Sequence, residues 1–362
     1  MNEFRDRIAR AQTAIRSQGL DALCVSIGSD LPYLTGYRAM PLERITMFVV
    51  PADGRATLVV PGLEASRVDV PDNLFDVREW AESDRPIAII DRLLGEAGAV
   101  AIGDETWSRF LLQLQEADPR RSFVPASDLM ATLRIRKSRV EIDALREAAG
   151  TVDAVVDEMS SVRFSGRSER DISREIIDRT IAGGHDSMDF WIVASGPNGA
   201  SPHHEPRERI VQHGDAVVVD FGGHQGGYCS DTTRMFVVGE PPHGFDEAFD
   251  VLRSAQAAAV DAVQPGVSAG SLDTVAREII AEAGYGELFI HRLGHGIGMD
   301  AHEHPYLIEG NAQIIESGMA FSIEPGIYVQ GQWGMRIEDI VTVTDDGVER
   351  LNQSDRDYRV VA

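Results

Sequence analysis

Two aspartates, Asp220 and Asp231, lie on either side of the glycine-rich stretch HQGG. The flanking segments VVVDFGG and SDTTRMFVV have the composition of strands, so the sequence predicts a hairpin with its turn at Gln225-Gly226. This register places the two aspartates opposite each other, with Cβ atoms about 5 Å apart. Like charges at that separation repel by about 1 kcal/mol in water and by about 4 kcal/mol at an effective dielectric constant of about 20. We therefore expect a cation between them.

A second predicted hairpin, GMAFSIEPGIYVQGQWGMRIEDIVTV, repeats this plan with glutamates. Glu324 and Glu338 lie at equal distances from Gly331, each among apolar residues. A single buried carboxylate is satisfied by a salt bridge, and Arg336 can neutralise one acid but not four. His295, from a glycine-rich segment between the hairpins, completes the set of candidate ligands.

Four carboxylates and one imidazole form a hard, oxygen-rich ligand set, and their four negative charges match two divalent cations. Because the set contains no thiolate, Mn²⁺ is the favoured ion, with Co²⁺ and Zn²⁺ as alternatives. A hydroxide held between two such cations is a nucleophile at neutral pH. These residues predict a two-metal hydrolase.

The stretch HRLGHGIGMDAHEHP, residues 291–305, holds four of the ten histidines of the chain. Its His-Glu pair does not match the helical zinc-protease signature, because Tyr306 stands where the second histidine is required and glycines oppose a helix. GHGIG is likewise a poor dinucleotide-binding fingerprint. We assign His295 to a metal ion and His291 and His302 to the substrate, as hydrogen-bond donors or proton carriers, and we treat His304 as structural.

Two copies of one plan, two helices followed by a hairpin, are predicted to position these residues. The first copy opens at Ser138, which has capping-box spacing to Glu141, and its second helix begins near Ser168 and stops at Gly183-Gly184. The second copy consists of DEAFDVLRSAQAAAVDAV, SLDTVAREIIAEAG and the glutamate hairpin. The order of these elements indicates an internal duplication.

Residues 1–132 are predicted to form a separate α/β domain, and residues 133–362 the catalytic one. After the helical, charged start MNEFRDRIARAQ, we expect strands at DALCVSIG, LPYLTGY, ITMFVVPADG and ATLVVPG, a helix at DRLLGEAG and a strand at AVAIGDE. This domain has no phosphate loop or catalytic cluster, so we expect it to serve packing, oligomerisation or substrate access. The basic run RIRKSR is interpreted as a helix start at the hinge.

Composition excludes several classes of function. A net charge of -24 argues against nucleic acid, and no apolar segment is long enough to cross a bilayer. The chain has 43% hydrophobic and 25% charged residues, which is typical of globular proteins. Its two cysteines, Cys24 and Cys229, are expected to be small buried residues in a reducing compartment, and we predict a cytoplasmic location.

The motifs SGPNGASPHH, VVVDFGG, SDTTR, GHGIG with HEHP, EPGIY and RIED resemble those of the pita-bread metallopeptidases. That family includes prolidases, aminopeptidases P, methionine aminopeptidases and creatinases. LPYLTGY resembles a signature of the N-terminal domain of prolidases, aminopeptidases P and creatinases. The resemblance implies a creatinase-like α/β domain followed by an α+β pita-bread domain with a pseudo-twofold repeat.

The resemblance also implies roles for individual ligands. Asp220 would bind one metal ion, His295 and Glu324 the other, and Asp231 and Glu338 would bridge the two. Glu324 would additionally act as general base or proton shuttle.

Further residues resemble the family's substrate contacts. His203, His291 and His302 correspond to histidines that bind substrate or stabilise the intermediate, and Arg336 to an arginine beside the last glutamate. The motif favours His203 over His204, a choice that stays open. The complete ligand set argues against a creatinase, which works without metal.

The expected function is that of an Xaa-Pro dipeptidase (prolidase), which hydrolyses the bond before proline in short peptides. Aminopeptidase P, which acts on longer peptides with proline second, is the alternative, and a non-catalytic peptide- or partner-binding relative is a third. The resemblance implies a homodimer. The sequence leaves open the residue preferred before proline, the metal used in the cell and the oligomeric state.

Overall fold

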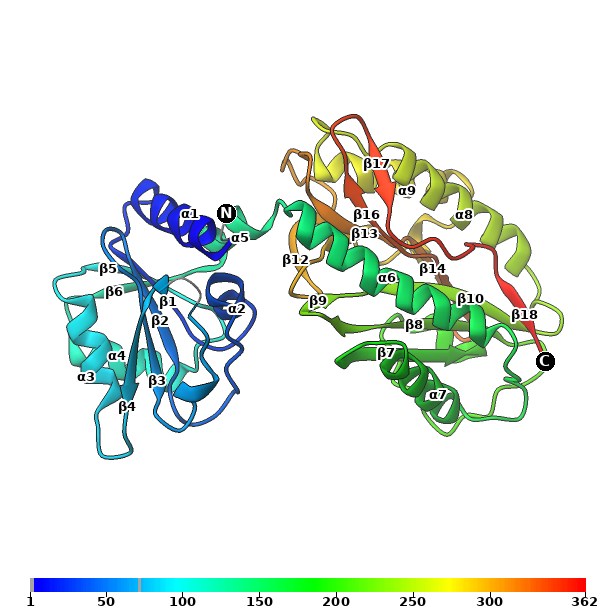
Figure 1. Ribbon diagram of the computed structural model, residues 1–362. Coiled ribbons are helices and arrows are strands. Elements are labelled where there is room, and N and C mark those ends of the chain that lie inside the picture. Colours follow the sequence, from blue (N-terminus) through cyan, green and yellow to red (C-terminus); the bar gives the residue numbers. More distant parts are fainter. Residues whose placement is uncertain (1–2, 71–72) are drawn as a thin grey trace. The chain divides into compact units, whose positions relative to one another are not determined.

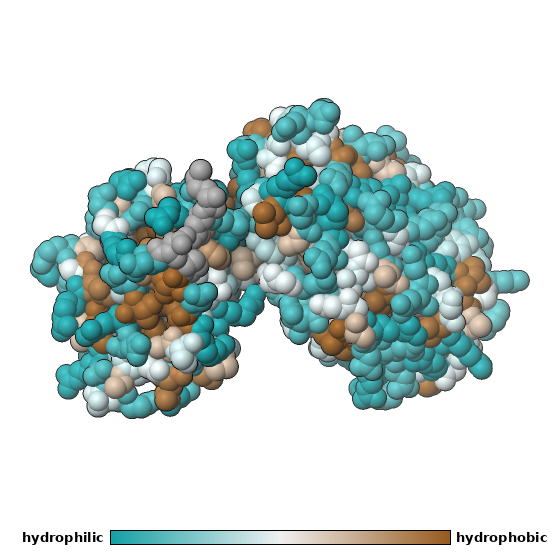
Figure 2. Space-filling view, viewed as in Figure 1, coloured by the Kyte–Doolittle hydropathy of each residue, from teal (hydrophilic) through white to brown (hydrophobic). Residues whose placement is uncertain are grey.

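The computed structural model describes residues 3–70 and 73–362. The chain divides into two compact units, Met1–Arg134 and Ile135–Ala362 (Figure 1). Hydrophilic residues cover much of the face of the second unit in Figure 2, whereas the first unit displays a hydrophobic area. Among the helices within the described ranges, none combines the length and apolar content that a membrane span requires.

The first unit is built on a six-stranded sheet with the order β4-β3-β2-β1-β5-β6. Central strand β1 runs antiparallel to β2 and parallel to β5. Side chains of one face of β1, Ala22 and Cys24, pack with helices α3 and α4, and α1 contacts β1 and β2. The elements are α1 (Glu3–Ser17), β1 (Ala22–Val25), α2 (Asp30–Thr35), β2 (Met47–Pro51), β3 (Thr57–Pro61), β4 (Asp76–Trp80), α3 (Pro86–Leu94), β5 (Ala99–Ile102), α4 (Ser108–Ala117), β6 (Ser122–Pro125) and α5 (Ser127–Arg134).

The opening helix is confirmed from Glu3 onward, while residues 1–2 of its predicted segment lie outside the described residues. The expectation of a strand at LPYLTGY is wrong, because this segment forms helix α2. Pro32 is tolerated in the first turn of a helix, and Gly36 ends α2 with the left-handed φ of 76°. A run of buried apolar residues this short does not distinguish a strand from a buried helix by periodicity.

The second unit contains three sheets and four long helices among its described elements, with sheet orders β18-β10-β8-β7, β12-β11-β13-β16-β17 and β14-β15. Its elements are α6 (Arg139–Met159), α7 (Glu169–Ala182), β7 (Ser187–Ser195), β8 (Ala216–Gln225), β9 (Tyr228–Cys229), β10 (Thr232–Val238), α8 (Phe245–Asp261), α9 (Ala269–Glu282), β11 (Gly294–Gly296), β12 (Glu303–Leu307), β13 (Ala320–Ile323), β14 (Gly326–Val329), β15 (Trp333–Arg336), β16 (Asp339–Val343), β17 (Val348–Arg350) and β18 (Arg359–Val361).

The two halves of this unit repeat one plan. Helices α6 and α7 cover the β7-β8-β10 sheet, and α8 and α9 cover the other half (Figure 1). Ser138 forms the predicted capping box with Glu141, and the second helix of each pair has a serine N-cap, Ser168 or Ser268. The predicted fold class, an α/β domain followed by an α+β domain with an internal repeat, is confirmed.

Strand β8 separates two hydrophobic cores. Val217 and Val219 pack with α6 and α7, whereas Ala216 and Val218 belong to the core that contains α8 and α9. Because side chains alternate along a strand, Asp220 continues the second face, toward the other half of the repeat. The hydrophobic pattern of β8 therefore directs this carboxylate to the interior.

The glutamate hairpin has the predicted register. Pairs Ile323↔Asp339 and Gly326↔Arg336 flank the two acids and place Glu324 level with Glu338. Gly331, with a φ of 75°, lies in the turn as expected.

The predicted register of the aspartate hairpin is wrong by two residues. The turn is at Gly226-Gly227, both with positive φ, and Asp220 pairs with Thr233 instead of Asp231. Two consecutive positive-φ residues suit a type I′ hairpin turn, which glycines adopt without a Cβ penalty. A shift of two residues keeps both aspartates on one face, so they lie diagonally rather than directly opposite.

Candidate metal centre

The two hairpins meet at Thr233. This residue pairs with Asp220 inside its own sheet and forms an isolated bridge to Glu338 of the other. Thr233 Oγ1 donates a hydrogen bond of 2.7 Å to Glu338 Oε2. The neighbouring Arg234, which is fully buried, donates to the Glu338 carbonyl oxygen and forms a 2.6 Å ion pair with Asp339. These contacts fix the spacing between the carboxylates of the two halves.

All five predicted ligands line one cavity of about 750 Å³. Donor atoms of Asp231, His295 and Glu338 lie within 4.8 Å of one another, and all three residues are buried. His295 Nε2 is 3.1 Å from Glu324 Oε1 and 3.8 Å from Asp231 Oδ2. Arg336 also lines this cavity. Residues from the two hairpins and from the His295 segment therefore converge on one cavity.

Two buried carboxylate oxygens in this cluster, Asp220 Oδ1 and Glu338 Oε1, have no hydrogen-bond partner among the described residues. Burial raises the pKa of both carboxyls, and the charge of Glu324 raises both further. Burial and the charge of Glu338 likewise raise the pKa of Asp231. Unpartnered buried oxygens among mutually repelling acids are suited to divalent cations, which supply the missing positive charge.

Glu324 differs from the other three acids. Burial opposes its ionisation, but the hydrogen bond and the charge of His295 outweigh this effect and lower the pKa of Glu324 to about 2. Ser322 Oγ also donates to Glu324 Oε1 at 2.9 Å. Glu324 is therefore the acid of this cluster that is most readily ionised.

Arg336 lies where it neutralises one acid of the cluster. Its guanidinium is hydrogen-bonded to Asp220 Oδ2, donates to Thr233 Oγ1 at 3.0 Å and donates to the Tyr328 hydroxyl at 2.7 Å. The sequence led us to expect it beside Glu338, which it reaches only through Thr233. One guanidinium on one of four carboxylates leaves most of the negative charge for other cations.

Tyr328 is a buried residue beside the carboxylate cluster that the sequence did not single out. Burial raises the pKa of its hydroxyl to about 12, so the group stays protonated. It lies 2.8 Å from His291 Nε2, and His291 Nδ1 is 2.8 Å from the Arg292 carbonyl oxygen. In the neutral ring, Nδ1 donates to that carbonyl and Nε2 accepts from Tyr328, which gives a chain Arg336–Tyr328–His291. A strand tyrosine in EPGIY is indistinguishable from a core residue by pattern alone.

The predicted substrate histidines surround the same space. His203, His291 and His302 line an adjoining cavity of about 310 Å³ that shares His295 and Glu324 with the larger one. The ring centroids of His295 and His302 are 4.1 Å apart. Burial lowers the pKa of His302 to about 4, so this ring is neutral at pH 7. His304 is exposed and packs on Tyr306, with ring centroids 4.9 Å apart.

Glu169, a second residue that the sequence did not reveal, holds the loop that carries His203. The Glu169 side chain is fully buried and accepts hydrogen bonds from Ser195 N and Oγ, Asn198 Nδ2, His204 Nε2 and Arg207 N, at 2.7–3.3 Å. Burial opposes ionisation, but these donors lower the pKa of Glu169. His204 is thus tied to Glu169, although it also borders the larger cavity, whereas His203 lines both cavities. An acid in the first turn of a helix is common, which conceals this role.

The fold and the cavity define a two-domain metallopeptidase. The Metallopeptidase family M24 model matches residues 143–345, and the Creatinase/Prolidase N-terminal domain model matches residues 7–136. The chain belongs to metallopeptidase family M24.

Relatives and solved structures match the chain over nearly its full length. The probable dipeptidase PepE of Mycobacterium tuberculosis is 42% identical, covering 99% of this chain and 96% of the relative. An Xaa-Pro dipeptidase of Lactobacillus helveticus is 35% identical, with 97% and 98% covered. The crystal structure of recombinant prolidase from Thermococcus sibiricus superposes with a TM-score of 0.92 at 37% identity, covering 99% of each chain.

Replacing Glu169 tests its role as a positioning residue. Glu169→Gln replaces one carboxylate oxygen, which accepts hydrogen bonds, with an amide N–H that faces the same donors. Each lost hydrogen bond to a charged group costs about 1.5–3 kcal/mol. We expect KM to rise about tenfold or more with kcat and bound metal nearly unchanged. Steady-state kinetics and metal analysis provide the measurement.

Glu175→Gln is the matched control, because Glu175 lies on the same helix but pairs with Arg167 and Arg179. Equal effects of the two variants on KM would show that Glu169 acts only on helix stability.

Proposed function

We propose that this metallopeptidase is an Xaa-Pro dipeptidase that hydrolyses the peptide bond before proline in short peptides. The main support is the convergence of Asp220, Asp231, His295, Glu324 and Glu338 on one cavity. The Lactobacillus helveticus relative bears the name Xaa-Pro dipeptidase, and the Thermococcus sibiricus structure is of a prolidase. Coverage of whole chains, rather than of one domain, supports the transfer of this activity.

The five side chains fit a pair of divalent cations. In the proposed arrangement Asp220 would hold one ion, His295 and Glu324 would hold the other, and Asp231 and Glu338 would be shared by the two. The proximity of Asp231, His295 and Glu338 and the unpartnered oxygens of Asp220 and Glu338 support this assignment. Carboxylate dominance favours Mn²⁺, with Co²⁺ and Zn²⁺ as alternatives. The chemistry such cations supply when bound is Lewis acidity, which makes water nucleophilic at neutral pH.

Side chains of the protein then transfer protons and orient the peptide. Glu324, ionised at neutral pH, accepts the proton of the attacking water and delivers it to the leaving proline nitrogen. His302, neutral and close to His295, donates a hydrogen bond to the scissile carbonyl oxygen, and His203 contacts the substrate from the opposite loop.

His291 fits a proton carrier better than a direct donor to the carbonyl. Both of its ring nitrogens are engaged, one by Tyr328 and the other by the Arg292 carbonyl. Arg336 holds Tyr328 in turn, so this chain fixes the orientation of the imidazole, and Nε2, which accepts the hydrogen bond from Tyr328, is the nitrogen that can take up a proton.

The proposal includes a cytoplasmic homodimer. Both cysteines are free and buried, which suits a reducing compartment. The hydrophobic area on the first unit in Figure 2 is suited to contact with a partner chain. Sedimentation of the purified protein measures its oligomeric state directly.

Substrate length distinguishes the proposed activity from its closest alternative. With Mn²⁺-loaded protein we expect release of proline from an Xaa-Pro dipeptide and little cleavage of the matching Xaa-Pro-Yaa tripeptide, measured by chromatography of the products. Cleavage of the tripeptide alone would assign the chain to the aminopeptidase P activity. Absence of metal-dependent cleavage of either peptide would favour a binding protein.

Two substitutions separate a metal-binding base from a substrate contact. Glu324→Gln removes the proton acceptor, so we expect kcat to fall by a factor of about 1,000 or more. His302→Ala removes one neutral hydrogen-bond donor, so we expect kcat to fall about 100-fold while both metal ions stay bound. Kinetics and metal content of each variant are the measurements. Loss of metal from His302→Ala would identify His302 as a ligand and contradict the assignment.

A further inference from the structure

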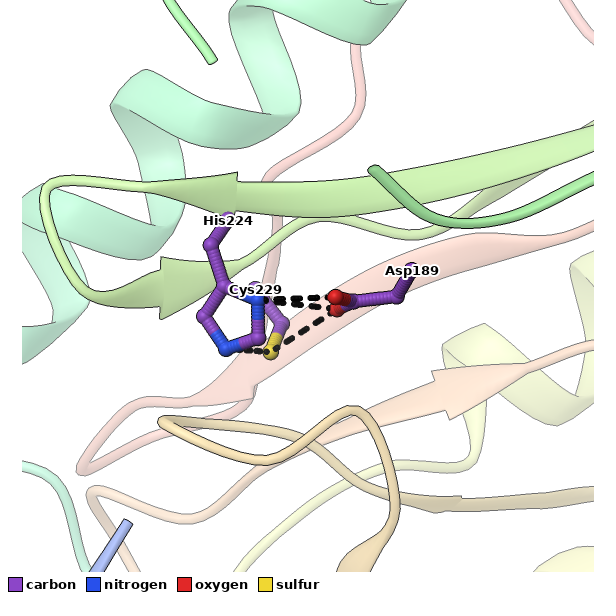
Figure 3. A group of neighbouring side chains, drawn as sticks. All are labelled: Asp189, His224 and Cys229. Atoms are coloured by element: carbon purple, nitrogen blue, oxygen red, sulfur yellow. Dashed lines mark hydrogen bonds and ion pairs between the residues drawn. The ribbon is translucent and has the colours of Figure 1, made fainter. Parts of the chain in front are cut away.

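A second group of potential ligands lies beside the cavity of the paired acids, with His224 and Cys229 on the aspartate hairpin and Asp189 on β7. Asp189, His224 and Cys229 point toward one another (Figure 3), and one donor atom of each lies within 4.8 Å of the others. His224 Nδ1 is 2.9 Å from Asp189 Oδ2, and His224 Nε2 is 3.3 Å from Cys229 Sγ. Cys229 Sγ is 4.0 Å from Asp189 Oδ2.

The backbone of three strands brings these side chains together. His224 of β8 pairs directly with Cys229 of β9, across the tight turn at Gly226-Gly227. Asp189 of β7 lies at a β-bulge, because the register with β8 shifts between Met188 and Phe190. Bulges redirect a side chain that regular pairing would place elsewhere. The cluster is therefore built by local backbone geometry and is not a chance meeting of long surface side chains.

The imidazole of His224 has more acceptors around it than a neutral ring can satisfy. Asp189 lies at Nδ1, and the carbonyl oxygen of Met299 lies 3.0 Å from Nε2. A neutral ring has one N–H, so one of these two oxygens would face a lone pair. A positive charge at the ring resolves the conflict. It can be supplied by a second proton on the imidazole or by a metal ion at Nε2.

A nucleophilic role for the trio does not fit. Cys229 is 1% exposed, so its thiol cannot be reached by a substrate electrophile.

We propose that Cys229 and His224 bind a thiophilic divalent cation such as Zn²⁺ or Co²⁺, with Asp189 holding the imidazole from its other nitrogen. A tetrahedral ion with Zn–S of about 2.3 Å and Zn–N of about 2.0 Å separates sulfur from nitrogen by about 3.5 Å. The observed 3.3 Å is within a few tenths of an ångström of this value. A carboxylate on the far nitrogen of a metal-binding histidine fixes the tautomer and makes the ring more basic.

The chemistry of this site differs from that of the paired acids. Sulfur and imidazole select softer ions, whereas the carboxylate cluster selects Mn²⁺. On binding, a metal–sulfur bond replaces the S–H bond, and the thiol proton leaves to solvent. Asp189 borders the larger cavity, so ions can approach from there. The Met299 carbonyl, adjacent to His224 Nε2, is positioned to act as a third ligand.

The test uses Co²⁺ as the probe on Mn²⁺-loaded full-length protein. Co²⁺ bound to a thiolate gives a ligand-to-metal charge-transfer absorption in the near ultraviolet, which carboxylate sites do not give. The chain has only two cysteines, so the source of the band can be assigned. We expect a band that saturates at one Co²⁺ per chain in the wild type, disappears in Cys229→Ser, and needs at least tenfold more Co²⁺ in His224→Gln.

Cys24→Ala is the matched control, because Cys24 is fully buried in the core of the first unit and should leave the band unchanged. Circular dichroism checks that each variant is folded, and His224→Gln keeps the thiol if Cys229→Ser does not fold. Absence of the band in the folded wild type, or its persistence in Cys229→Ser or unchanged affinity in His224→Gln, would overturn the proposal.

Discussion

Electrostatic repulsion among four carboxylates, three of them buried, is the constraint on which the catalytic unit depends. Asp220, Asp231, Glu324 and Glu338 share one cavity, and burial makes their mutual repulsion much stronger than in water. Arg336 forms its ion pair with Asp220, one of the four. Divalent cations bound between the carboxylates would offset the remaining repulsion. The repulsion that destabilises the metal-free protein therefore favours metal binding.

The surrounding structure holds the four carboxylates at a fixed spacing. Thr233 and Arg234 join the two hairpins through backbone pairing and buried hydrogen bonds, so the halves of the repeat cannot slide without separating the acids. Glu169 acts at greater range by holding the loop of His203. Stability and site geometry therefore share the same contacts, and substitutions at these residues should affect both.

Local patterns in the sequence were sufficient to predict the helix caps, the repeat and the register of the glutamate hairpin. The aspartate hairpin was predicted two residues out of register, because HQGG allows more than one two-residue turn and only the structure shows that Gly226-Gly227 is used. Contacts between distant segments, such as Glu169 with His204 or Tyr328 with His291, leave no periodic signal. The bulge that presents Asp189 to Cys229 belongs to the same class.

We propose that the carboxylate cluster holds two cations between the hairpins. Diffraction data from crystals grown with Mn²⁺, collected at the manganese absorption edge, test this most directly. We predict two anomalous peaks per chain, both enclosed by the five side chains Asp220, Asp231, His295, Glu324 and Glu338. A single peak, peaks coordinated by other residues, or ordered carboxylates with no peak between them would contradict this arrangement of two cations.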